Sequence, residues 1–82
     1  MARPRIVLAD DELNLRKVLG AILNRDGYEV LEGRDGEEAL RLVELHPNIA
    51  AVITDLRMPR LDGMGVLRRV VAEHPDVPVI MI

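Results

Sequence analysis

Short runs of β-branched and aliphatic residues alternate with segments of helical periodicity along this 82-residue chain. Runs that are apolar throughout predict strands covered on both faces, whereas apolar residues spaced three and four apart predict helices with one buried side. The alternation therefore predicts one α/β domain, residues 1–82, built around a parallel sheet. No linker or low-complexity tract divides this stretch.

The boundaries of the expected elements follow from turn and capping residues. Strands are expected at residues 5–9, 28–32, 49–54 and 77–82, and helices at residues 12–26, 36–46 and 63–74. Asp35 and Glu38 match a capping box, and Pro47 ends the helix that they begin. Two glutamates in the second strand favour an edge position for it.

Each helix is expected to pack through its apolar stripe. In the first helix the stripe consists of Leu15, Val18, Leu19, Ile22 and Leu23, and in the third it consists of Val66, Leu67, Val70 and Val71. Gly65 breaks the helical pattern, at a cost of about 1 kcal/mol relative to alanine in a helix interior. The sequence offers no reason for this glycine.

The composition excludes several classes of function. The chain has no cysteine, which removes disulfides and thiolate metal sites and fits a cytoplasmic location. Tyr28 is the only aromatic residue and the net charge is -3, so direct nucleic-acid binding is not expected. The longest apolar run, residues 77–82, is far shorter than the roughly 20 residues of a membrane span. Arg60, Arg68 and Arg69 could form a small basic surface for a partner, but a solvated face of the third helix is the favoured interpretation.

Acidic residues follow two of the predicted strands directly. Asp10 and Asp11 come after the first strand, and Asp55 comes after the third. A strand order that turns back after the second strand makes the first and third strands neighbours. It also puts the first helix alone on one face of the sheet. The three carboxylates then converge at the topological switch point, where open α/β sheets bind their ligands.

Three neighbouring carboxylates repel one another and favour a bound cation. Oxygen-only ligands select a hard ion, for which Mg²⁺ is the natural candidate. With Mg²⁺ bound, Asp55 is the best candidate to attack a phosphoryl group, because it begins a loop with Met58-Pro59 and Asp62-Gly63 turns. Any one of these aspartates is equally consistent with a cap or turn, and Asp11 is also a candidate cap for the first helix. The combination of an acidic pair after the first strand with Asp55 after the third is more specific than any one of these residues.

Four segments resemble the receiver domain of two-component response regulators. They are Ile6–Glu12 (IVLADDE), the GYEV of residues 27–30, Asp35–Leu40 (DGEEAL) and Asp55–Gly63 (DLRMPRLDG). The resemblance implies a flavodoxin-like, doubly wound parallel sheet of order 2-1-3-4. The sequence around Asp55 is similar to the corresponding segment in receivers of the nitrogen-regulation type of enhancer-binding activators.

The resemblance also implies roles for individual residues. Asp55 would accept a phosphoryl group from a sensor histidine kinase, and Asp11 and Asp55 would bind Mg²⁺ directly. Asp10 would reach the ion through water, and the backbone carbonyl of Arg57 would complete the protein ligands. Such a domain is a switch for an output such as transcription and catalyses at most its own phosphorylation and dephosphorylation.

Family receivers have a fifth strand and two further helices, and this sequence is expected to be truncated within the fourth strand. The family's Ser or Thr after strand four and its strand-five Lys are then expected to have no counterpart in this sequence. An alternative is therefore a pseudo-receiver or truncated interaction module that forms homo-oligomers through the exposed fourth strand or the bare sheet face. A phosphohydrolase and a flavin-binding module fit the acidic pattern less well.

Overall fold

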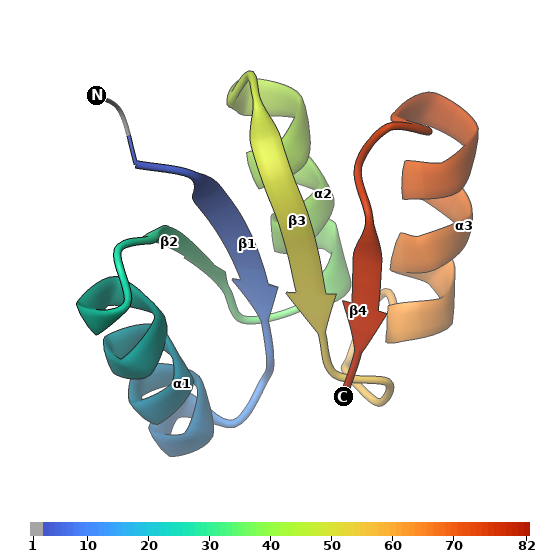
Figure 1. Cartoon of the computed structure of the whole chain (residues 1–82). Helices are drawn as coiled ribbons and strands as arrows, with labels where there is room; N and C mark the ends of the chain where they lie inside the picture. Colours follow the sequence, from blue (N-terminus) through green and yellow to red (C-terminus); the bar gives the residue numbers. More distant parts are fainter. Residues whose placement is uncertain (1–2) are drawn as a thin grey trace.

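The computed structural model describes residues 3–82 as a parallel sheet with helices on both faces (Figure 1). The elements in chain order are β1 (Arg5–Ala9), α1 (Leu13–Arg25), β2 (Glu29–Gly33), α2 (Gly36–Leu45), β3 (Ile49–Thr54), α3 (Gly63–Glu73) and β4 (Val79–Met81). The predicted α/β alternation is confirmed. The predicted domain also includes Met1 and Ala2, which lie outside the described residues.

The strand order is β2-β1-β3-β4, with every neighbouring pair parallel. In the middle of the sheet, Val7 of β1 lies opposite Leu31 of β2 on one side and Val52 of β3 on the other. Val52 in turn pairs with Val79 of β4. The predicted order 2-1-3-4 and the edge position of β2 are both confirmed, and β4 forms the second edge.

The two faces of the sheet are covered unequally. Alternate β1 residues point to opposite faces. Val7 and Ala9 join the main core with α2 and α3, whereas Leu8 faces α1. The buried members of this core are Val7, Ala9, Ala39, Leu40, Val43, Ile49, Val52, Val66 and Val70. As predicted, α1 alone covers the other face (Figure 1).

Each helix begins at an acidic cap whose carboxylate accepts a backbone N–H of the first turn. Glu12 accepts from Leu15 at 2.6 Å, Asp35 accepts from Glu38 at 2.8 Å, and Asp62 accepts from Gly65 at 2.9 Å. The prediction that Asp11 caps α1 is therefore wrong, because Glu12 occupies the cap position. Asp11 is left free for the carboxyl edge of the sheet.

The predicted packing stripes are wrong in part. Val18 of α1 is 56% exposed and Val71 of α3 is 59% exposed. On α1, Leu15 and Ile22 are also exposed while Leu19 and Leu23 are half-buried. This follows because α1 packs over β1 and β2 with no second helix beside it among residues 3–82.

The fourth strand is shorter than predicted, covering Val79–Met81 rather than residues 77–82. Pro78 has no N–H to donate to a sheet, so regular pairing starts after it. Its carbonyl oxygen still accepts the N–H of Val52 at 2.9 Å, which aligns the strand with β3.

Candidate metal site at the carboxyl edge of the sheet

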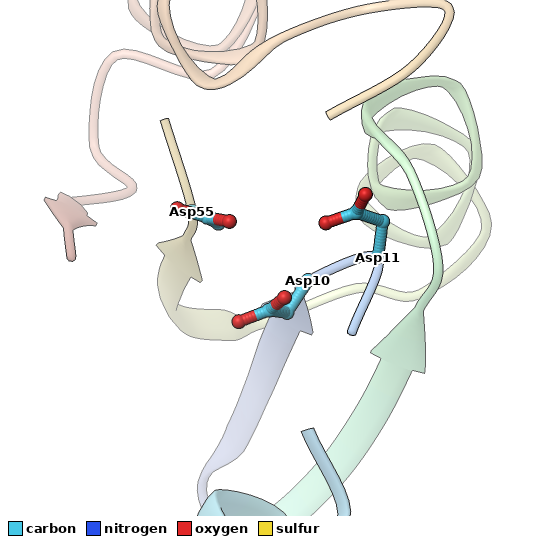
Figure 2. A group of neighbouring side chains, drawn as sticks. All are labelled: Asp10, Asp11 and Asp55. Carbon is cyan, nitrogen blue, oxygen red and sulfur yellow. The ribbon is translucent and has the colours of Figure 1, made fainter. Parts of the chain in front are cut away.

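Two neighbouring strands bring the predicted acidic residues together. Asp10 follows β1 and donates its N–H to Gly33 O at 3.1 Å, while Asp55 follows β3 and donates its N–H to Ala9 O at 2.9 Å. These bonds continue the sheet pairing one residue beyond the strands. As a result, one carboxylate oxygen each from Asp10, Asp11 and Asp55 lies within 4.8 Å of the others (Figure 2).

Asp10 is the buried member of this acidic triad, with 1% of its surface exposed. Its Oδ1 accepts the N–H of Glu12 at 2.9 Å, but its Oδ2 is buried without a hydrogen-bond partner among the described residues. A buried carboxylate oxygen without a partner is costly, and a bound cation is one way to satisfy it. This orphaned oxygen shows that the residues fit a metal ion.

Asp11 is exposed and Asp55 is half-buried, and their side chains point toward the same space from opposite sides (Figure 2). Asp55 Oδ1 accepts the N–H of Leu56 at 2.8 Å, which fixes the carboxylate and leaves Oδ2 available. The cluster therefore offers oxygen ligands on one side and solvent on the other. Such a half-open oxygen site suits Mg²⁺, which keeps several of its waters when bound to protein.

Two supporting contacts hold the backbone of the triad. Arg16 of α1 donates from Nη1 to the carbonyl oxygen of Asp10 at 2.6 Å and from Nε to Glu32 at 3.0 Å. Thr54 donates its hydroxyl to the carbonyl oxygen of Asp55 at 3.0 Å. Neither contact was predicted from the sequence. Arg16 shares the helical spacing of the half-buried Leu19 and Leu23, which was the signal that it points inward.

Arg57 lies in the β3–α3 loop, two residues beyond Asp55, and its side chain is exposed. This places it close to the triad in sequence. The role of its carbonyl as a metal ligand stays a prediction.

An ion pair that was not predicted joins the β3–α3 loop to the start of α2. Arg60 of the β3–α3 loop is within 2.7 Å of Asp35, the buried cap of α2. The N–H of Glu38 and then the Arg60 guanidinium hold the pKa of Asp35 below its ordinary value, although burial opposes them. The same contact raises the pKa of Arg60. Arg60 is thus part of a specific ion pair and not only of a solvated basic face.

The fold and the site together define a class of protein: an α/β domain with an acidic cluster at the switch point of a parallel sheet. Residues 6–82 match the family model of the response regulator receiver domain. The chain therefore belongs to the receiver domains of two-component signalling. Such a domain is a phosphoacceptor switch. Across residues 3–82, no helix combines the length and apolar character that crossing a bilayer requires.

Several curated relatives are longer proteins that are named as probable transcriptional regulators. The chain is 43% identical over 81 residues to the probable transcriptional regulator ycf27 of Cyanophora paradoxa, covering 98% of this chain and 33% of that protein. It is 42% identical over 81 residues to the ycf27 protein of Galdieria sulphuraria, covering 98% and 31%. The chain thus spans about a third of the length of the curated relatives that it matches.

Solved structures agree with the fold. A receiver domain protein from Clostridium thermocellum superposes with a TM-score of 0.90 at 35% identity, covering 95% of this chain and 63% of that chain. The response regulator TrrA from Thermotoga maritima, solved in complex with Mg²⁺-BeF, gives a TM-score of 0.89 at 35% identity, covering 95% and 67%. Both likenesses extend over nearly all of this chain.

Proposed function

We propose that this receiver domain accepts a phosphoryl group on Asp55 from a phosphohistidine of a sensor kinase, with Mg²⁺ held by the acidic triad. The observation that carries the proposal is the buried, orphaned Oδ2 of Asp10, in a cluster where Asp10, Asp11 and Asp55 each offer a carboxylate oxygen within 4.8 Å of the others. The complex of TrrA with Mg²⁺-BeF supports it by likeness. Asp10, Asp11, Asp55 and the carbonyl of Arg57 would hold the ion.

Asp55 is the nucleophile in the proposed transfer. Its Oδ2 attacks phosphorus while Oδ1 keeps the hydrogen bond from Leu56, so the carboxylate does not rotate away. The P–N bond of the donor breaks, its electron pair leaves with the imidazole ring, and an aspartyl phosphate forms. Bound Mg²⁺ would supply neutralisation of the charge that collects on the phosphoryl oxygens.

The output of the switch is also part of the proposal. The relatives named as probable transcriptional regulators suggest that a longer protein with this receiver controls transcription. The finer assignment to the nitrogen-regulation type of activators stays a prediction.

The direct test is phosphorylation by a small phosphoryl donor such as acetyl phosphate, followed by intact-mass spectrometry with and without Mg²⁺. We expect one added phosphoryl group, dependent on Mg²⁺, in the unaltered chain and in Asp76→Asn, which changes an exposed turn residue. Asp55→Asn should remain unmodified. Equal labelling of Asp55→Asn would overturn the role of Asp55.

A second candidate function is self-association, and an apolar groove on the α1 face favours it. The groove has a volume of about 190 Å³ and is lined by Leu8, Leu19, Ile22, Leu23, Ile53, Ile80 and Ile82. It runs to β4, an edge strand whose outer backbone groups could pair with a second copy. This candidate needs no phosphorylation.

Sedimentation equilibrium tests the second candidate function, self-association. If copies associate through this face, Ile80→Glu should give a monomer, because it places a charge on a side chain that is 49% exposed at the groove. Val71→Glu, at an exposed position on α3, is the matched control and should leave association unchanged. A monomeric mass for the unaltered chain at high concentration would reject self-association.

A further inference from the structure

Arg60 has a backbone conformation that is uncommon for a residue with a side chain. It lies in the β3–α3 loop with φ of 67°, in the left-handed region that side chains other than glycine rarely adopt. Its Nε and Nη2 atoms both lie 2.7 Å from the same oxygen, Oδ2 of Asp35. The guanidinium is therefore directed back to α2, although 54% of the Arg60 side chain is exposed to solvent.

The receiving carboxylate is fixed as well. Asp35 is 4% exposed, and its Oδ1 accepts the N–H of Glu38 at 2.8 Å in the first turn of α2. One oxygen thus caps the helix while the other binds Arg60. Because both oxygens are engaged, Asp35 joins the start of α2 rigidly to the loop.

The next residues of each segment are in direct contact. A Cβ on Gly36 would overlap the carbonyl oxygen of Leu61, so the loop backbone lies on the first turn of α2 at a distance that only glycine allows. The loop closes nearby through the N–H of Gly63, which donates to Leu56 O at 2.8 Å. Leu56 in turn donates to Asp55 Oδ1. A continuous chain of contacts leads from Asp35 to the candidate phosphoacceptor.

We propose that the Arg60–Asp35 ion pair is a tether that holds the β3–α3 loop against α2 and thereby sets the geometry of the acidic triad for its metal ion. Arg60 is then a positioning residue that acts through the loop backbone without contacting the ion. The inference rests on the proposed function, since it concerns the Mg²⁺ site at Asp55.

The sign of the effect distinguishes a tether from simple electrostatics. Arg60 is a cation near an acidic cluster, so charge alone predicts that its removal strengthens Mg²⁺ binding. Removal of the charge on Asp35 would by the same reasoning weaken binding. A tether predicts that both changes weaken binding, and that the double variant is hardly worse than either single one.

The test is calorimetric titration of the folded chain with Mg²⁺. Arg60→Gly suits the left-handed backbone and removes the whole side chain with its guanidinium, while Asp35→Asn keeps an oxygen for the cap. We expect the Mg²⁺ dissociation constant to rise about threefold or more in each, a smaller loss than the tenfold or more typical of groups that contact a metal ligand. Arg69→Ala removes an equally exposed arginine that pairs with Glu73 and should change nothing.

The outcomes are separable from those of the proposed function. If the unaltered chain binds no Mg²⁺, the metal site itself is rejected. A different result rejects the tether alone. In that case the unaltered chain binds Mg²⁺ and Asp55→Asn does not, but Arg60→Gly binds Mg²⁺ as tightly as the unaltered chain or more tightly. Melting curves recorded by circular dichroism for each variant establish that the titrated protein is folded.

Discussion

At the scale of single residues, Asp35 links stability to pH. Its carboxylate accepts the Glu38 N–H and binds Arg60, and both contacts favour the charged form in the folded chain. The pKa of the folded state therefore lies below that of the unfolded state. Asp35 stabilises the fold above the unfolded pKa of about 4, and this contribution is lost as the pH falls through the folded pKa.

We expect Asp35→Asn to flatten the acid limb of the stability curve. Below about pH 4 the free energy of unfolding of the unaltered chain should fall more steeply, by up to about 1.4 kcal/mol per pH unit for the one additional proton. Urea denaturation across this range measures both slopes. Asp26→Asn, at the exposed end of α1, is the control and should keep the original slope. Identical slopes for Asp35→Asn and the unaltered chain would contradict the assignment.

At the scale of elements, α3 shows that helical periodicity alone does not define a buried face. Val70 is fully buried while its neighbour Val71 is 59% exposed, although both belong to the apolar stripe that the sequence predicted. The helix presents only its narrow Val66–Val70 line to the sheet. Two valines in one turn thus have different packing.

This difference predicts that valine-to-alanine substitutions at the two positions lower the free energy of unfolding by different amounts. Val70→Ala should lower the free energy of unfolding by about 2 kcal/mol, because it removes buried methyl groups and leaves a cavity. Val71→Ala should change it by less than about 0.5 kcal/mol, as is usual for surface positions. Urea denaturation of the pair measures both values. Comparable losses for the two variants would show that α3 is rotated about its axis.

The strand and helix order could be predicted because it depends on local patterns. The cap at Asp35 and the strand Ile49–Thr54 follow from residues close in sequence. Burial on α1 depended instead on whether another helix shares its face, which periodicity does not report. The end of β2 moved by one residue for a similar reason, since Gly33 pairs with Ala9 across the sheet.

Contacts between distant segments could not be predicted in the same way. The Arg60–Asp35 pair joins residues 25 positions apart and depends on how the loop folds back. Gly65 was unexplained in the sequence, and the structure shows what a side chain would meet there: a Cβ would overlap the side chain of Leu61, which would have to move. The acidic triad was predictable because parallel strands bring their carboxyl ends to one edge, so the topology alone defines its place.

At the scale of the whole molecule, the topology concentrates negative charge at the point where β1 and β3 end. The sheet order makes these strands neighbours, and the carboxylates of Asp10, Asp11 and Asp55 meet there without a basic side chain among the ligands. The fold therefore bears a repulsion that a cation would remove. Stability of the entire domain should consequently depend on the ion.

Thermal melting measures this dependence. At Mg²⁺ concentrations ten times the dissociation constant, binding to the native state alone stabilises it by about 1.4 kcal/mol, which corresponds to a rise of roughly 6–11 °C in the melting midpoint for a chain of this size. Without Mg²⁺, Asp55→Asn should itself raise stability by about 1 kcal/mol, because one of the repelling charges is gone. The same variant should lose most of the rise with Mg²⁺, whereas Asp76→Asn should keep it. If the melting midpoint of the unaltered chain does not change with Mg²⁺, the triad binds no ion. Self-association through the α1 face would then become the leading candidate function.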